Sequence, residues 1–103
     1  RQRFVALRFD YPAAAEEERI VANEAQVDAA LAAQVVKLGQ ALRRLEQHDL
    51  EEVASTRLLI FAARMIRSGM TPREACLACL AEPLSDDPQT VAALMGVVDV
   101  HFA

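Results

Sequence analysis

The sequence predicts an all-α fold of four to five helices, preceded by a single β-strand that has no partner in the chain. Alanine, which has the highest helix propensity, occurs 20 times among the 103 residues. From Ala13 onward, apolar residues recur at the three- and four-residue intervals of one helix face. Only Phe4-Val5-Ala6-Leu7-Arg8-Phe9 alternates as a strand does. We therefore expect one helical domain, long enough to bury a single core.

The strand over residues 4–9 is expected to end at Pro12, which fixes its own φ. A lone strand leaves its backbone edges unpaired, which folded proteins avoid. We therefore expect residues 1–11 to be the last strand of a sheet that lies upstream, and residues 12–103 to form the helical domain. The chain opens with Arg1 rather than Met, which agrees with a piece of a longer protein.

The first helix is expected to follow Pro12, a residue that suits the first position of a helix. Glu16, Glu17 and Glu18 then lie near its positive end. Three adjacent glutamates raise the question of a metal or acid/base site. Because neighbours on a helix point in different directions, we interpret them as a solvated face.

The second helix is expected from about Asp28 to Gln47. Its larger apolar residues alternate at intervals of four and three, which gives a narrow apolar seam: Leu31, Val35, Leu38, Leu42 and Leu45. Gly39 interrupts this helix at a cost of about 1 kcal/mol relative to alanine, and we expect it to allow a close helix crossing.

Ser55 is a good N-cap for a third helix that runs to about Arg67 and stops at Gly69. Asp49 and Glu52 are spaced as a capping box for a short preceding turn. No Gly or Pro separates Asp49 from this helix, so one continuous helix is the alternative. The apolar arc is wide, with one stripe of Leu58, Phe61, Ala62 and Met65 and a second of Leu59, Ala63 and Ile66.

Thr71-Pro72-Arg73-Glu74 is the clearest local signal, because it combines an N-cap, a first-turn proline and a capping-box glutamate. This helix is expected to stop at Glu82-Pro83. Asp87-Pro88 repeats the cap and proline and opens the last helix. The buried stripe of that helix is expected to comprise Val91, Leu94, Met95, Val98 and Phe102.

Arg57 lies in the first turn of the helix that Ser55 caps. A cation there faces the positive end of the helix dipole, at a cost of about 0.3–1 kcal/mol. An arginine beside unpaired backbone N–H groups suits a docked anion, and phosphate is the usual one. The alternative is a surface arginine in water. In one continuous helix from Asp49, Arg57 would lie mid-helix and the argument for an anion would weaken.

Composition and charge limit the classes of function that this chain can have. The net charge of −4 disfavours nucleic acid and anionic membranes as partners, and no apolar run approaches the roughly 18 residues of a membrane helix. Two cysteines without an export signal indicate a reducing cytoplasm. Cys76 and Cys79 form a lone CxxC several residues into a helix, which favours buried small side chains over a metal or redox site. We therefore expect no metal, and we find no catalytic apparatus in this chain.

Five stretches stand in an order and spacing that together are specific: Gln2-Arg3-Phe4-Val5-Ala6, Phe9-Asp10-Tyr11-Pro12, Leu50-Glu51-Glu52, Ser55-Thr56-Arg57-Leu58-Leu59 and Pro83-Leu84-Ser85-Asp86-Asp87-Pro88. They resemble the C-terminal part of a MoxR-type AAA+ ATPase, and within that class the CbbQ/NorQ/GvpN group. The resemblance covers almost the whole chain. It implies that the strand closes the ATPase core sheet and that the helices form a lid over the nucleotide.

The resemblance also implies roles for individual residues. Arg57 matches the sensor 2 arginine, which reaches the phosphates of ATP, and Ser55 and Thr56 beside it are expected to help bind the nucleotide. Arg3 matches the arginine finger, which reaches a neighbouring subunit's ATP in a homo-hexamer, and Arg1 is the fallback. ATP and Mg are implied for the full-length protein and neither for this fragment. The family often has Gly where this chain has Val53. Because Gly permits positive φ and Val does not, we expect the turn before Ser55 to be built differently here.

The group is similar to chaperone-like activators, of Rubisco for CbbQ and of nitric oxide reductase for NorQ, that work with a von Willebrand factor A-type partner. The resemblance therefore implies an ATPase in full length, with no activity in this fragment and with a client the sequence does not identify. The alternative is a stand-alone helical interaction or dimerisation module. DNA binding through residues 71–81 is poorly supported, because Arg73 is the one basic residue there.

Overall fold

Helices make up the regular structure of residues 11–45 and 54–102, the part of the chain that the computed structural model describes. The elements are α1 (Ala14–Ala25), α2 (Ala29–Arg43), α3 (Thr56–Arg67), α4 (Pro72–Cys76), the π-helical segment η2 (Leu77–Ala81), α5 (Glu82–Leu84) and α6 (Pro88–His101). Because α4, η2 and α5 run on without a break, these ranges hold five helices, and the predicted all-α class is confirmed. The strand predicted over residues 4–9 lies outside the described residues.

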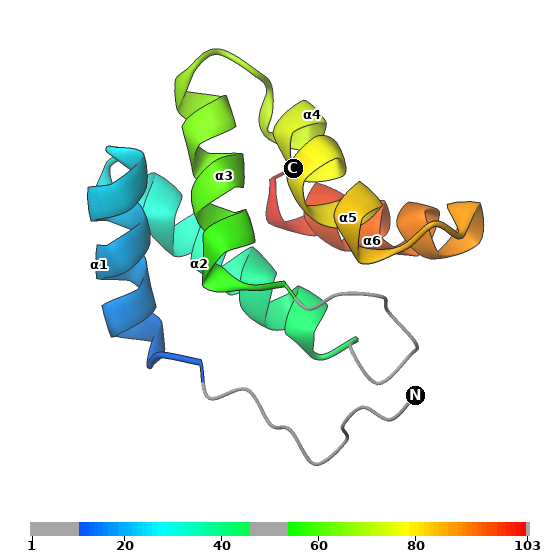
Figure 1. Ribbon diagram of the computed structural model, residues 1–103, viewed down its shortest axis with the longest axis horizontal. Coiled ribbons are helices and arrows are strands. Elements are labelled where there is room, and N and C mark those ends of the chain that lie inside the picture. The colour runs from blue at the N-terminus through cyan, green and yellow to red at the C-terminus, as the bar shows by residue number, and fades with distance from the viewer. Residues whose placement is uncertain (1–10, 46–53, 103) are drawn as a thin grey trace.

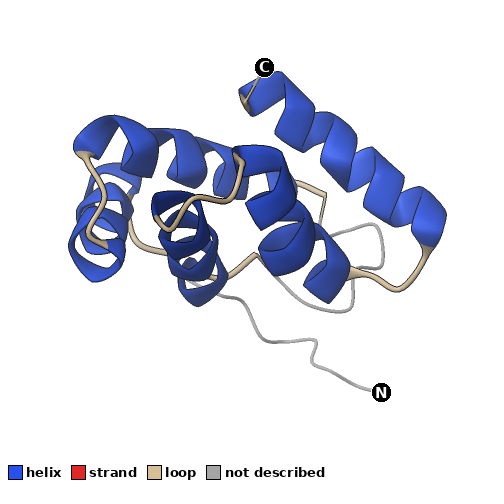
Figure 2. Cartoon of the chain, turned by 90° about the horizontal axis from the view of Figure 1, so that it is seen from above, coloured by secondary structure: helices blue, strands red, loops and turns tan. Residues whose placement is uncertain are grey.

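The helices form two groups that share one core. Figure 1 shows α1 and α3 side by side across α2, with α4, α5 and α6 on the other side of α3. In the view from above, α6 extends along the outer edge of the molecule (Figure 2). The core draws on every helix, and its largest fully buried apolar side chains are Leu38, Leu42, Leu59, Leu80, Leu84, Leu94, Val21, Val35, Val36 and Val98.

Helix α2 begins where the sequence predicts and ends earlier. The Asp28 carboxylate accepts a hydrogen bond from the Leu31 backbone N–H at 2.8 Å, so Asp28 is its N-cap. The helix ends at Arg43, short of the predicted Gln47. The Leu45 N–H donates to the carbonyl of Leu42, a three-residue turn that tightens the chain and closes the helix.

Helix α3 starts as a separate helix, because the helical geometry is interrupted at Ser55. Ser55 has extended backbone angles, φ −74° and ψ 162°, and its hydroxyl accepts from the Leu58 N–H at 3.2 Å. This excludes the continuous helix through Ser55 that the sequence left open. The predicted stop is confirmed, because Gly69 follows Arg67 and Ser68 with φ +119°. The capping box predicted at Asp49 lies outside the described residues.

Only part of the wide apolar arc of α3 is buried. Leu59, Ala62 and Ala63 are fully buried, whereas Phe61 is 41% exposed and Met65 is 38% exposed. Helix α3 packs against α1 and α2 and against α4 and η2, and the small alanines let those neighbours approach. The larger Phe61 and Met65 are left on the open side.

Gly39 makes the close crossing that the sequence predicts. A Cβ atom at this position would lie 2.7 Å from Leu59 Cδ1 and 2.9 Å from Leu59 Cδ2, closer than such atoms can approach. The absent side chain therefore lets α2 and α3 pack at Leu59, and this contact fixes how the two helices cross.

The capping box at Thr71 is confirmed in both halves, with the Glu74 N–H donating to Thr71 Oγ1 at 3.1 Å and the Thr71 N–H donating to Glu74 Oε1 at 3.2 Å. The predicted stop at Glu82-Pro83 is wrong. The helix continues to Leu84 through the π-helical turn of η2, in which the Glu82 N–H bonds the carbonyl of Leu77, five residues back. A wider turn gives the ring of Pro83 room against the preceding carbonyls.

The last helix agrees with its prediction. The Asp87 carboxylate caps α6 by accepting from the Gln89 N–H at 3.3 Å, and Pro88 opens the helix. The predicted stripe is buried at Leu94, Met95 and Val98, while Val91 and Phe102 pack half-buried against the core.

Candidate functional site

Arg57 occupies the second residue of α3, and its side chain is exposed. It makes no hydrogen bond or ion pair with any other residue in 11–45 or 54–102. The first N–H groups of any α-helix lack partners within the helix, and the dipole makes that end positive. The start of α3 therefore presents a free guanidinium next to backbone donors, a combination that suits an anion.

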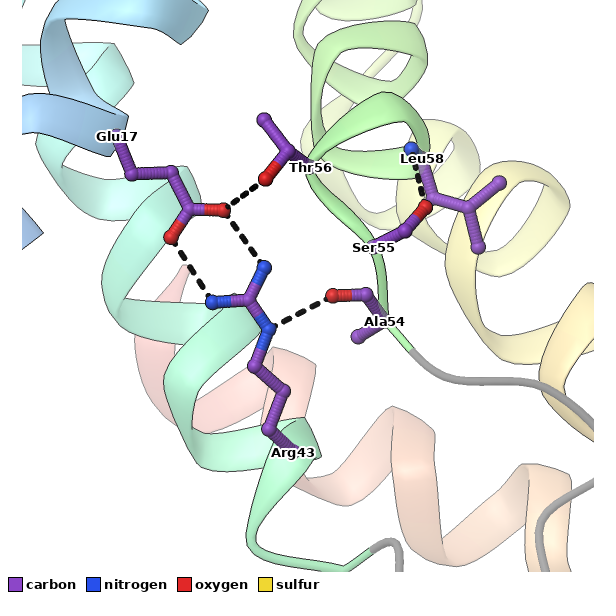
Figure 3. Close-up of polar contacts among 6 residues, drawn as sticks. All are labelled: Glu17, Arg43, Ala54, Ser55, Thr56 and Leu58. Atoms are coloured by element: carbon purple, nitrogen blue, oxygen red, sulfur yellow. Dashed lines mark hydrogen bonds and ion pairs between the residues drawn. The ribbon is translucent and has the colours of Figure 1, made fainter. Parts of the chain in front are cut away.

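Ser55 and Thr56, expected beside Arg57 at the nucleotide, both have their hydroxyls engaged inside the domain. Ser55 Oγ caps α3 through the Leu58 N–H. Thr56 Oγ1 donates to Glu17 Oε2 at 2.7 Å (Figure 3). Any contact of these two residues with a phosphate would therefore use their backbone N–H groups, which are the donors that helix N-termini present.

The Glu17 carboxylate lies at the centre of a buried polar cluster. Its side chain has no exposed surface, and that of Arg43 is 9% exposed. Arg43 Nη1 donates to Oε1 of Glu17 at 2.9 Å and Nη2 donates to Oε2 at 2.6 Å, a bidentate ion pair (Figure 3). The prediction that all three glutamates form a solvated face is wrong for Glu17, because α2 and α3 cover it.

The pKa of Glu17 reflects two opposing effects. Burial on its own raises the pKa, because it disfavours the charged carboxylate. The hydrogen bonds from Arg43 and Thr56 and the positive charge of Arg43 outweigh this, so the pKa of Glu17 is lowered below its ordinary value. Glu17 is therefore a charged structural anion at neutral pH rather than a proton donor.

The guanidinium of Arg43 also contacts segments on either side of this pair. Its Nε donates to the carbonyl oxygen of Ala54 at 2.8 Å, just before α3. The Tyr11 ring lies over it, with the centroid 3.6 Å from Cζ. One arginine therefore joins the segment before α1, α1 itself, the end of α2 and the start of α3.

Comparison with known proteins places the chain in a family. Residues 17–101 match the family model described as CbbQ/NirQ/NorQ C-terminal. The chain belongs to this family. The matched range begins at Glu17 and contains Arg43 and Arg57, so the buried cluster and the exposed arginine both lie within the family domain.

Three curated relatives show the range of similarity. The chain is 93% identical over 102 residues to the denitrification regulatory protein NirQ of Stutzerimonas stutzeri, 44% over 103 residues to the protein CbbQ of Hydrogenophilus thermoluteolus, and 44% over 102 residues to the protein NorQ of Paracoccus denitrificans. These matches cover 99–100% of this chain and 37–39% of the relatives. The chain therefore spans about two fifths of the length of the curated relatives it matches.

Both cysteines of the CxxC in this chain pack against the core. Cys76 is fully buried, and burial with the nearby Cys79 raises its pKa to about 12. Cys79 is half-buried against the core, and burial raises its pKa too. Within the described residues, no group of three His, Cys, Asp or Glu side chains is placed to hold a metal ion. None of the helices there is long and apolar enough to cross a membrane.

The sequence analysis placed Arg57 correctly in the first turn of α3 and missed the buried Glu17–Arg43 pair. A signal existed, because Glu17 stands four residues before Val21 and eight before Ala25, both buried. Glu17 therefore continues the buried stripe of α1 by one turn. The start of α1 also differs from the prediction, since Ala13 is the N-cap and Pro12 precedes it. Arg1, Arg3 and Val53 lie outside the described residues.

Proposed function

We propose that this CbbQ/NirQ/NorQ C-terminal domain is the lid of a MoxR-type AAA+ ATPase and that Arg57 acts as its sensor 2 residue. In this role Arg57 contacts the phosphates of ATP. The ATP is bound with Mg to the ATPase core, which is a separate part of the longer protein. Relatives more than twice as long as the chain support a core outside it. Arg3 is proposed as the arginine finger in a homo-hexamer, with Arg1 as the fallback.

The observation that carries this proposal is the free cation at the start of α3. Arg57 is exposed, lies in the first turn of a capped helix, and has no ion partner among residues 11–45 and 54–102. A cation in that turn gains nothing from the helix dipole and gains much from an anion that also accepts from the helix N–H groups. The planar guanidinium suits phosphate oxygens.

Two exposed apolar residues on the same side of α3 as Arg57 support a lid that closes over the ATPase core. Phe61 and Met65 follow Arg57 at intervals of four residues, so the three side chains share one side of α3. Both are large, apolar and more than one third exposed. A lid that closes on its core would bury this side and would carry Arg57 towards the nucleotide.

The relatives support denitrification as the system in which this ATPase acts. The 93% identity to a protein named as a denitrification regulatory protein is far above the 44% identity to CbbQ. We therefore favour a metalloenzyme of denitrification as the client, with nitric oxide reductase as the first candidate, over Rubisco. A von Willebrand factor A-type partner and a cytoplasmic location complete the proposal.

The test is Arg57→Ala in the full-length protein, with Arg67→Ala at the other end of the same helix as the matched control. Loss of a charged donor to the transferring phosphate is expected to cost about 2–4 kcal/mol in the transition state, or roughly a hundredfold in ATP turnover. The domain is expected to stay folded, because Arg57 is exposed and the buried Leu59 remains. Arg67→Ala is expected to leave turnover near that of wild type.

Three outcomes would contradict the assignment. The first is turnover of Arg57→Ala within about twofold of wild type, the level at which no contact to the transition state has been removed. The second is an equal loss in Arg57→Ala and Arg67→Ala, which would indicate a general effect of charge on α3. Unfolding of Arg57→Ala would make Arg57 a structural residue.

A further inference from the structure

We propose that Arg43, held by Glu17, is a positioning residue that sets the location of Arg57 at the nucleotide. This inference rests on the proposed function of Arg57. It is carried by the buried pair, whose hydrogen bonds reach the two residues that flank the N-cap of α3. Neither Glu17 nor Arg43 would touch ATP, and both would act through the start of α3.

The contacts converge on one short segment. Arg43 Nε holds the carbonyl of Ala54 at 2.8 Å, one residue before Ser55. Thr56 Oγ1, one residue after Ser55, donates to Glu17 Oε2 at 2.7 Å. Figure 3 shows these two bonds on either side of Ser55. Because Arg57 follows Thr56 directly, bonds to α1 and α2 on both sides of the cap position its backbone.

The Glu17–Arg43 pair is held rigidly, because both side chains are hydrogen-bonded and are shielded from water. Both oxygens of Glu17 accept, and the Nε, Nη1 and Nη2 atoms of Arg43 all donate. The planar guanidinium makes these bonds in one fixed geometry, which a lysine ammonium cannot reproduce. The side chains have 0% and 9% exposure, so water does not replace a lost bond without opening the domain.

Stability alone does not account for such a pair. Replacing a buried ion pair with apolar side chains of similar volume is often neutral or stabilising, because the charges must lose their hydration. What this pair adds is a defined geometry at the start of α3. The Tyr11 ring on the same guanidinium extends that geometry to the segment that leads into α1.

The test combines hydrogen exchange with a double-mutant cycle in the full-length protein. Arg43→Lys keeps the positive charge and removes the planar guanidinium that donates to Glu17 and Ala54 at the same time. It is made in the wild-type and Arg57→Ala backgrounds, and the kcat and KM for ATP are measured in each. Arg73→Lys is the matched control, because Arg73 makes an ion pair with Asp99 that is 61% and 50% exposed.

Arg43→Lys is expected to lower kcat about tenfold or more in the wild-type background, the scale of loss that a small displacement of a reacting group produces. The loss is expected to shrink to less than about twofold once Arg57 is absent, because the two residues then act as one unit. Exchange is expected to quicken in peptides covering residues 54–62 and to stay unchanged over residues 88–101. Arg73→Lys is expected to change neither quantity.

An equal fold-loss of kcat in both backgrounds would overturn the inference and make Arg43 a structural residue. Unchanged exchange over residues 54–62 would overturn it as well. If Arg43→Lys does not fold, Glu17→Gln, which keeps the shape and removes the charge, enters the same cycle with the same criteria. An unaltered turnover in Arg57→Ala alone would instead refute the proposed function, while the exchange result would still decide whether Arg43 holds the start of α3.

Discussion

Glu17 illustrates at the scale of one residue how a buried charge is tolerated. Its carboxylate receives three hydrogen bonds, two from Arg43 and one from Thr56, and these replace the water it loses. Removing one partner leaves the other charge buried and unpaired, which typically costs about 3–5 kcal/mol. The pair is therefore sensitive to single substitutions even though its net contribution to stability is small.

The pH dependence of stability provides a prediction for Glu17. Its pKa in the folded protein is lowered from the ordinary 4.5, so the unfolded chain binds the proton more readily. The charged carboxylate therefore stabilises the fold fully above pH 4.5, and this contribution is lost as the pH falls through the lower folded pKa. Urea unfolding of wild type and Glu17→Gln is expected to show a gap that narrows below pH 4.5.

The control for this measurement is Glu16→Gln, which changes an exposed glutamate on the same helix. At neutral pH its unfolding free energy is expected to differ from that of wild type by no more than about 1 kcal/mol, the scale of a helix-dipole contribution. The contradicting result is a difference in unfolding free energy between wild type and Glu17→Gln that stays constant from neutral pH down to pH 3, about 1.5 pH units below the ordinary carboxyl pKa of 4.5. It would show that the charge of Glu17 does not contribute to stability.

The two residues on which the proposals depend differ in how far the sequence could predict their surroundings. The place of Arg57 was predictable because the argument is local, a cap at Ser55 followed by a cation in the first turn. The burial of Glu17 had a local signal, but its partners were not predictable, because Arg43 lies 26 residues away and Thr56 lies 39 residues away. Helix periodicity shows which side of α1 is buried and gives no information about what covers it.

At the scale of elements, the crossing of α2 and α3 depends on one missing side chain. Gly39→Ala would gain about 1 kcal/mol of helix propensity and would force a Cβ against Leu59, an overpacking that typically costs 1–3 kcal/mol. Leu59 is fully buried and has little room to move. We therefore expect Gly39→Ala to destabilise the domain by about 1 kcal/mol net.

Gly96→Ala is the matched control, because Gly96 lies inside α6 with nothing within 4 Å of a Cβ at that position. It is expected to stabilise by about 0.5–1 kcal/mol through helix propensity alone. Chemical unfolding of the two variants would measure both effects. Stabilisation by both substitutions would show that Leu59 yields easily and that the close contact does not limit the crossing.

Local sequence signals predict the helix ends that have a side-chain cap. They fail where the end depends on the hydrogen-bond register of the preceding turn. Thr71, Asp87 and Ser55 were predictable as caps, because each cap is a contact within three residues. The end at Pro83 was not, because a proline is expected to stop an α-helix. The π-helical turn of η2 changes the register before Pro83, and no residue pattern in this stretch predicts such a turn.

At the scale of the whole molecule, the candidate site belongs to the group formed by α1, α2 and α3. Their contacts fix the start of α3. Helix α4 and segment η2 pack on the other side of α3, and α6 packs against α2, α4 and η2 (Figure 1). This arrangement leaves the side of α3 with Arg57, Phe61 and Met65 open to a further surface.

The isolated chain is therefore expected to be mainly helical and to bind ATP weakly, because a lone arginine and a few N–H groups replace little of a phosphate cradle. Circular dichroism would measure the helix content, and calorimetric titration with Mg and ATP would measure the affinity. A micromolar dissociation constant for the isolated chain would contradict the lid assignment, since it would require a complete nucleotide site within these 103 residues.

The central claim, that Arg57 reaches the phosphates of ATP, is tested most directly by an experimental structure of the full-length protein with Mg and a non-hydrolysable ATP analogue. A guanidinium nitrogen of Arg57 is expected within about 2.7–3.2 Å of a phosphate oxygen, the range of a charge-assisted hydrogen bond. The Glu17–Arg43 pair is expected to remain intact beneath it. A nucleotide bound with its phosphates held by other cations, while Arg57 points into solvent or pairs with a carboxylate, would contradict the account.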